Sequence, residues 1–239
     1  MVVSIILIIA VVALMVALGI YGSYAAEQRR KALVAWGQAH GLMFNADKAY
    51  GLDDRYPDFD CLRSGSNRYA YNTLTGAYKN WSCRAFDYHY ETRSTDSKGR
   101  QQTQHHHFSA AIIDSPVPLK PLFIRPEGLF DKVKEFFGME DIDFESAEFS
   151  RKFYVKAPDR KWAYDVIHPR TMEFMLSMPM FTLRLAGSEA IVYRGTTFKP
   201  EEFSQAIEVL TGILERLPDY AVKQLLAEAP HGAQAAGGT

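Results

Sequence analysis

The chain has 239 residues, of which 47% are hydrophobic and 23% charged, and this length suffices for one core of ordinary size or two small ones. Its 27 Lys and Arg against 28 Asp and Glu give a net charge of -1. This balance disfavours nucleic acid as a partner, because phosphate binding requires an excess of basic side chains. The two cysteines, Cys61 and Cys83, are too few for a disulfide framework and match no zinc spacing, so we expect reduced thiols.

Residues 1–24 contain no charged side chain, and residues 2–20 are almost wholly Val, Ile, Leu, Ala and Met. At about 1.5 Å per residue, a helix of this length crosses a hydrocarbon layer of about 30 Å. We therefore predict a single transmembrane helix over residues 1–24, with the lipid bilayer as its partner.

A cleaved signal peptide is the alternative, because Ser-Tyr-Ala at residues 23–25 resembles a small-x-small cleavage site, with cleavage at Ala25. The segment lacks a basic n-region and exceeds the usual apolar region of about 7–15 residues, so the anchor is favoured. Arg29, Arg30 and Lys31 follow the apolar segment and no basic residue precedes it. The positive-inside rule thus predicts a single-pass protein of the cell inner or plasma membrane, with a cytoplasmic globular domain.

The rest of the chain divides into three parts. Residues 25–41 are predicted to form a juxtamembrane helix with Leu33 and Trp36 on one face and Gly41 as its stop. Residues 42–229 are predicted to form one globular domain, and residues 230–239 a disordered tail of small residues.

Within the domain, the sequence predicts an antiparallel meander followed by a region richer in helix. Residues 51–72 are expected to be irregular, and apolar alternation then predicts strands over residues 69–79, 81–92, 105–113 and 121–126. Further on, we predict helices over residues 128–138, 146–153, 168–178 and 200–218, and a hairpin of residues 181–186 and 189–195 around Gly187. Strands and helices without a βαβ rhythm indicate an α+β fold.

Residues 86–108 raise the main chemical question. On neighbouring strands, Asp87, His89 and Glu91 share one face, and His105, His107 and Ser109 can share it on the partner strand. Such imidazoles and carboxylates suit zinc or another divalent metal. The other interpretation is a solvent-exposed polar face, which antiparallel sheets commonly keep, and a register slip of one residue would disperse the set. The second interpretation is favoured, so we predict no metal and no cofactor.

No other motif points to a reaction. The chain has no G-x-S-x-G, G-x-G-x-x-G, Walker or H-E-x-x-H motif. We interpret Asp165 and His168 as helix-terminal hydrogen-bonding groups, and Pro118 and Pro121 as part of a rigid loop between strands. No catalytic residue is therefore assigned, and an enzyme is the less favoured class.

Residues 143–176 resemble the hallmark of a bacterial family of membrane-anchored proteins without an established activity. The pattern is E-S-x-E-F-x-x-x-F-x-V-x-x-x-D, then A-Y, then a Pro-led helix with Met-Glu. The matching positions are Glu145, Ser146, Glu148, Phe149, Phe153, Val155, Asp159, Ala163, Tyr164, Pro169, Met172 and Glu173. The resemblance implies a bacterial membrane protein and brings no site residue with it.

The leading hypothesis is a non-enzymatic, single-pass membrane protein whose α+β domain binds a protein or a ligand at the cytoplasmic membrane surface. The alternative is a membrane-tethered enzyme whose reaction depends on a metal held by His89, His105 and His107. An exported domain released by cleavage at Ala25 is the third hypothesis.

Overall fold

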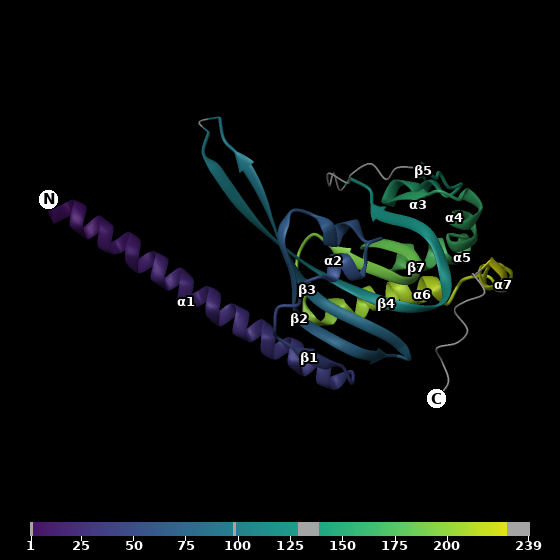
Figure 1. Cartoon of the computed structure of the whole chain (residues 1–239), viewed down its shortest axis with the longest axis horizontal. Coiled ribbons are helices and arrows are strands. Elements are labelled where there is room, and N and C mark those ends of the chain that lie inside the picture. The colour runs from purple at the N-terminus through teal and green to yellow at the C-terminus, as the bar shows by residue number, and fades with distance from the viewer. Residues whose placement is uncertain (1, 98, 129–138, 229–239) are drawn as a thin grey trace.

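A continuous helix, α1 (Val2–Ala39), leads from the apolar N-terminal segment into the folded part of the chain (Figure 1). The computed structural model of the protein describes residues 2–97, 99–128 and 139–228. The large apolar side chains of α1 from Ile9 to Ile20 are all exposed, and the helix is long and apolar enough to cross a membrane. It runs without a break through the predicted membrane segment and the predicted juxtamembrane helix.

The C-terminal part of α1 packs against the domain. Leu33 and Trp36 are buried, which confirms the predicted apolar face. The Trp36 ring stacks on Tyr78 with centroids 6.1 Å apart, and its indole N–H donates to Ser204 Oγ at 3.1 Å. The chain leaves the helix at Gly41, whose φ of 71° is the left-handed conformation that favours glycine.

One antiparallel sheet forms the centre of the domain, in the order β1-β2-β3-β4-β6-β5, with β7 also paired to β4. The long strand β4 pairs first with β3 and further on with β6, while β7 lies along its other edge. The strands are β1 (Met43–Asn45), β2 (Ser66–Tyr78), β3 (Trp81–Thr95), β4 (Gln101–Pro126), β5 (Glu140–Asp141), β6 (Phe153–Ala157) and β7 (Thr182–Arg194).

Two predicted strands, residues 105–113 and 121–126, are joined in the single strand β4, so the predicted loop around Pro118 is wrong. Pairing with β3 ends at Ile113 and pairing with β6 begins at Phe123. Between Ile113 and Phe123, this edge of β4 pairs with neither β3 nor β6. The prolines in that segment, which have no N–H to donate, therefore cost the sheet no hydrogen bond there. On the other edge, the register with β7 shifts in this region. The prolines therefore mark a change in the sequence at a point where the backbone of β4 stays extended.

The predicted hairpin around Gly187 is also wrong, because β7 is one strand and both of its halves pair with β4. Gly187 has a φ of 58° and lies opposite Leu119, between two register shifts. A positive-φ glycine serves a bulge as well as a hairpin turn, so the sequence pattern does not separate the two.

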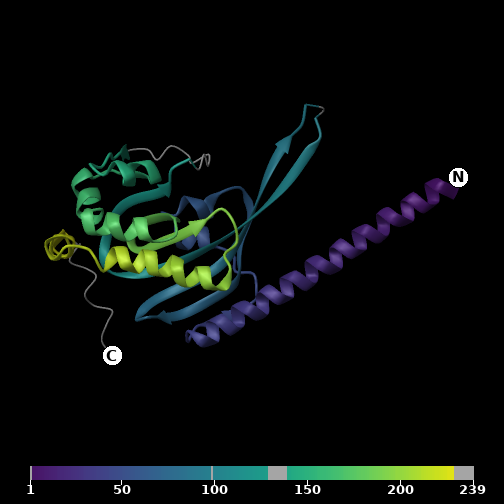
Figure 2. The same cartoon turned by 180° about the vertical axis from the view of Figure 1, so that it is seen from behind.

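Both faces of the sheet are covered. One face packs against α1 and α6 (Pro200–Leu214). Figure 2 shows α6 running across this face of the sheet. The other face carries Phe86, Tyr88 and Phe108, as predicted, under two short helices. These are α2 (Leu52–Arg55) and the 3-10 helix η1 (Asp60–Arg63), within the segment that was expected to be irregular.

The remaining helices are α3 (Ala147–Lys152), α4 (Arg160–Val166), α5 (Pro169–Ser177) and α7 (Asp219–Glu228). As predicted, Ser146 caps α3 by accepting from Phe149 N at 3.3 Å, and Pro169 begins α5. Two helices, α4 and α7, were not among the predicted elements. The predicted helix at residues 128–138 and the predicted tail at residues 230–239 fall on residues outside the described ranges, apart from Gly128.

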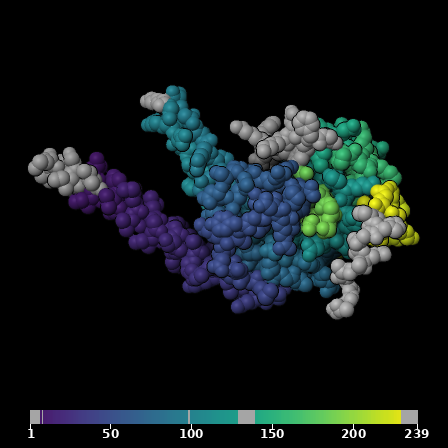
Figure 3. Space-filling view, in the orientation of Figure 1, coloured from purple at the N-terminus to yellow at the C-terminus, as the bar shows by residue number. Residues whose placement is uncertain are grey.

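The strands β3 and β4 extend beyond their neighbours as a two-stranded ribbon, which we call the β3–β4 ribbon (residues 92–104). Pairing of β2 with β3 reaches only Glu91, whereas β3 and β4 stay paired to Thr95 and Gln101. The ribbon and α1 project from the same end of the domain as two separate arms (Figures 1 and 3).

We expect Gly37→Ala to lower the free energy of unfolding by about 1–3 kcal/mol, as overpacking of a core does. A Cβ at this position lies 2.5 Å from Leu74 Cδ2, where α1 crosses β2. The matched control is Gly22→Ala on the same helix, whose Cβ meets nothing within 4 Å. Thermal unfolding of the full chain in detergent measures both variants. Equal stability of the two would contradict the close approach of α1 to the sheet.

Candidate functional site

The register of β3 and β4 assembles the polar face that the sequence suggested. Asp87 lies opposite Ser109, His89 opposite His107, and Glu91 opposite His105. The solvent-exposed interpretation is wrong for half of this row: Asp87 and Ser109 are fully buried, and His89 is 3% exposed. The row therefore runs from a buried end under α1 to an exposed end at the base of the β3–β4 ribbon, where His105 and His107 are exposed.

At the buried end, Arg29 of α1 binds Asp87 through two parallel hydrogen bonds. Its Nε donates to Asp87 Oδ2 at 2.9 Å and its Nη2 donates to Oδ1 at 2.6 Å. Asn72 Nδ2 and Ser109 Oγ complete the shell of the carboxylate, at 3.0 Å and 2.5 Å. Arg29 Nη1 also donates to the carbonyl of Phe198, at 2.5 Å. We call this network the Arg29–Asp87 clamp.

The clamp fixes α1 to the sheet. Bidentate, charge-assisted bonds are strong and directional, and a buried carboxylate is costly without its cation. No sequence pattern predicts the clamp, because Arg29 lies beside Arg30 and Lys31 and fits the basic flank of a membrane helix equally well. The available signal was Asp87, a carboxylate flanked on β3 by the aromatic residues Phe86 and Tyr88.

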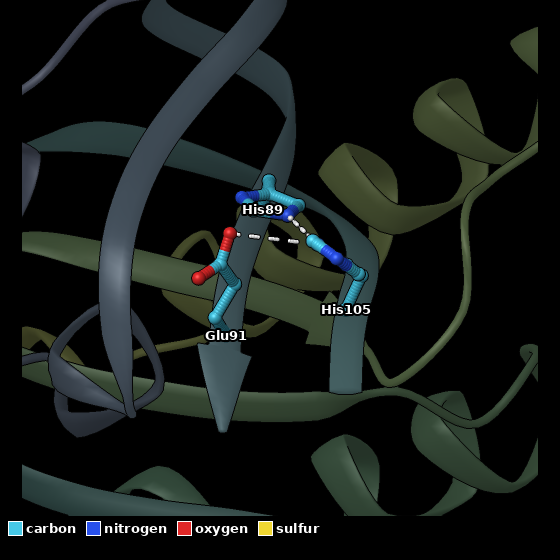
Figure 4. Close-up of side chains that lie close together, drawn as sticks. All are labelled: His89, Glu91 and His105. Atoms are coloured by element: carbon cyan, nitrogen blue, oxygen red, sulfur yellow. Dashed lines mark hydrogen bonds and ion pairs between the residues drawn. The ribbon is translucent and has the colours of Figure 1, made fainter. Parts of the chain in front are cut away.

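At the other end, His89, Glu91 and His105 point toward one another (Figure 4). His89 Nε2 lies 3.1 Å from His105 Nδ1, and Glu91 Oε1 lies 3.5 Å from the same nitrogen. One ligand atom from each of the three residues lies within 4.8 Å of the other two. Imidazole and carboxylate groups at this spacing are able to hold a divalent metal.

Neighbouring groups orient this cluster. His89 Nδ1 contacts the carbonyl oxygen of Asn67 at 3.0 Å, and its ring stacks on Tyr69 with centroids 4.5 Å apart. The side-chain amide of Asn67 donates to Glu91 Oε1 at 2.6 Å. This hydrogen bond, with the nearby imidazoles of His105 and His89, lowers the pKa of Glu91 and favours its ionised form.

His107 does not join the cluster, although the sequence placed it in the candidate ligand set. Its Nδ1 lies 3.0 Å from the hydroxyl of Tyr71. Desolvation of its ring, together with the neighbouring imidazoles of His89 and His105, lowers the pKa of His107. Asp87 is likewise separated from the cluster, because its oxygens are occupied in the clamp.

The other residues weighed in the sequence have structural contacts. His168 Nε2 lies 2.9 Å from the carbonyl of Arg216, and Asp165 accepts from Lys161 and Tyr220 at 2.8 Å and 2.7 Å. Both cysteines are free thiols, and burial raises the pKa of Cys83 to about 11.

The fold and α1 together define an α+β domain carried on a candidate membrane-anchoring helix. No protein-family model matches the chain, and no curated protein sequence is similar to it. The fold is similar to that of the mycobacterial trehalose monomycolate transport factor A, TtfA, in its crystal structure. The TM-score is 0.57 at 13% sequence identity, and the match covers 80% of this chain and 95% of that one. At this identity the similarity shows a shared fold.

We expect Arg29→Ala to lower the free energy of unfolding by about 3–5 kcal/mol, because it leaves the Asp87 carboxylate buried without its cation. Arg30→Ala is the matched control, since Arg30 pairs with Glu27 in an exposed position, and its loss should cost at most about 1 kcal/mol. Chemical denaturation of the full chain in detergent compares them. A similar loss for both variants would show that the clamp adds no stability.

Proposed function

We propose that the protein is a non-enzymatic accessory factor of a bacterial cell membrane, whose α+β domain binds another membrane-associated protein. The observation that carries this proposal is the Arg29–Asp87 clamp. Because α1 is continuous and is bound to the sheet by a bidentate pair, the domain is held in one orientation relative to the anchor. A fixed orientation is suited to presenting one surface to a partner in the same membrane.

Two further observations support this function. The fold is shared with a protein described as a transport factor, which is compatible with an accessory role beside a transport system. The resemblance of residues 143–176 to a family of membrane-anchored bacterial proteins agrees with the same setting.

The cytoplasmic side is the proposed location of the domain. Arg29, Arg30 and Lys31 lie directly after the apolar segment, and Lys and Arg near the end of a membrane helix favour the cytoplasm. Arg30 and Lys31 also pair with Glu27, but acidic residues contribute little to this rule.

The first test is membrane attachment. We expect the full chain to sediment with membranes in the absence of detergent, and the double substitution Val12→Arg and Val16→Arg to release it as a folded protein. Each arginine at the centre of a membrane helix costs about 2.5–3.5 kcal/mol, and both positions are exposed in α1, away from the domain. Val12→Leu with Val16→Leu is the control that stays attached. A wild-type chain that is intact and soluble would contradict the anchor.

The second test is partner binding by the domain. We expect proximity labelling in membranes to mark a specific protein with the full chain but not with residues 1–41 alone, because the domain supplies the binding surface. The two proteins carry the same membrane segment, so nonspecific neighbours are common to both. If both mark the same set of proteins, the domain is not a protein-binding module.

A further inference from the structure

The base of the β3–β4 ribbon carries three metal-ligand groups that the proposed accessory role does not use. Tetrahedral zinc with ligands at about 2.0–2.1 Å separates neighbouring ligand atoms by about 3.3 Å. The distances from His105 Nδ1 to His89 Nε2 and to Glu91 Oε1, 3.1 Å and 3.5 Å, bracket this value. We propose that His89, Glu91 and His105 bind one divalent cation of the zinc class, in a site that joins β3 to β4.

The tautomer of His89 prepares the site for a cation. A backbone carbonyl only accepts hydrogen bonds, so His89 Nδ1 carries the proton that it gives to Asn67 O. The lone pair of His89 Nε2 then faces His105. This arrangement, in which the second imidazole nitrogen donates to a carbonyl, is the usual support of a metal-ligating histidine.

Because His89 Nε2 is an acceptor in this tautomer, its 3.1 Å contact with His105 requires a proton on His105 Nδ1 when no metal is bound. Glu91 Oε1 lies 3.5 Å from the same nitrogen. A cation at this point replaces the proton, which moves to Nε2 of the exposed His105 ring through exchange with water. Three ligands with one carboxylate then surround the metal, and the exposed side of His105 leaves a fourth position for water.

The proposed site lies where a bound metal would affect the structure of the β3–β4 ribbon. Glu91 is the last β3 residue paired with β2, and β7 pairs with β4 only from Ser109 onward. The ribbon therefore leaves the sheet at the proposed site. A cation bound by residues of both strands ties the ribbon together at its base.

The test measures metal directly on the full chain, purified in detergent without a histidine tag and stripped with a chelator. Titration with Zn²⁺ against a colorimetric chelator should show one equivalent bound, and Co²⁺ should give the visible absorption of a tetrahedral site. His105→Asn and Glu91→Gln should each weaken zinc binding at least about tenfold, the effect already expected from loss of an outer partner. Circular dichroism checks that these variants stay folded.

Two neighbouring histidines are the controls. His106→Asn alters the opposite face, where His106 stacks on Tyr90 with centroids 4.6 Å apart, and it should leave zinc affinity unchanged. His107→Asn removes a ring that contacts His89, with centroids 4.9 Å apart, but it removes none of the three ligand atoms, so it should lower zinc affinity less than His105→Asn does. Less than one equivalent of zinc on the wild-type chain, undiminished binding by His105→Asn, or a loss with His107→Asn as large as with His105→Asn would overturn the proposal.

Discussion

The bidentate pair between Arg29 and Asp87 is the interaction on which the arrangement of this protein depends. Asp87 is fully buried in the central sheet, and its oxygens accept from Arg29, Asn72 and Ser109. A carboxylate in this position is stable only with its cation, and the cation comes from the helix that also carries the apolar N-terminal segment. The domain is therefore joined to the apolar segment by a continuous helix and not by a flexible linker. The last turns of the anchor helix are part of the fold.

This constraint limits how the domain is placed relative to the apolar segment of α1. With Leu33 and Trp36 in the core and Arg29 bound to the sheet, the direction of α1 from the domain is fixed. The β3–β4 ribbon leaves the same end of the domain (Figure 1). The proposed partner, if it lies beside α1, would therefore meet the ribbon and the neighbouring strands before it meets α5 or α7 on the far side. Substitutions along the ribbon are accordingly the most direct way to map the proposed partner surface.

Sequence patterns predicted the elements whose cause is local and failed where the cause lies far along the chain. Alternation in β3 and the cap at Ser146 depend on neighbouring residues, and both were correct. The clamp joins residues 58 positions apart, so no local pattern contains it. Gly187 shows the same limit, since only the pairing partner decides between a bulge and a hairpin. For the candidate site, alternation predicted which side chains share a face, but it left the register of β3 and β4 open. The burial of Asp87 depends on its pairing with Arg29 of α1, and His107 contacts the hydroxyl of Tyr71, and neither contact is visible in a local pattern.

The polar row on β3 and β4 has a further role in specifying the fold. Replacing a buried ion pair by apolar groups of similar size is often neutral or stabilising, so stability alone does not explain the clamp. Because side chains alternate along a strand, a slip of β3 by one residue moves Asp87 to the opposite face of the sheet, among the apolar side chains of Phe59, Leu62 and Phe108. There the carboxylate loses Arg29, Asn72 and Ser109 together. The same slip separates His89 and Glu91 from His105, so the correct register is the one that satisfies both ends of the row. The burial of Asp87 thus sets the strand alignment on which the proposed metal site depends.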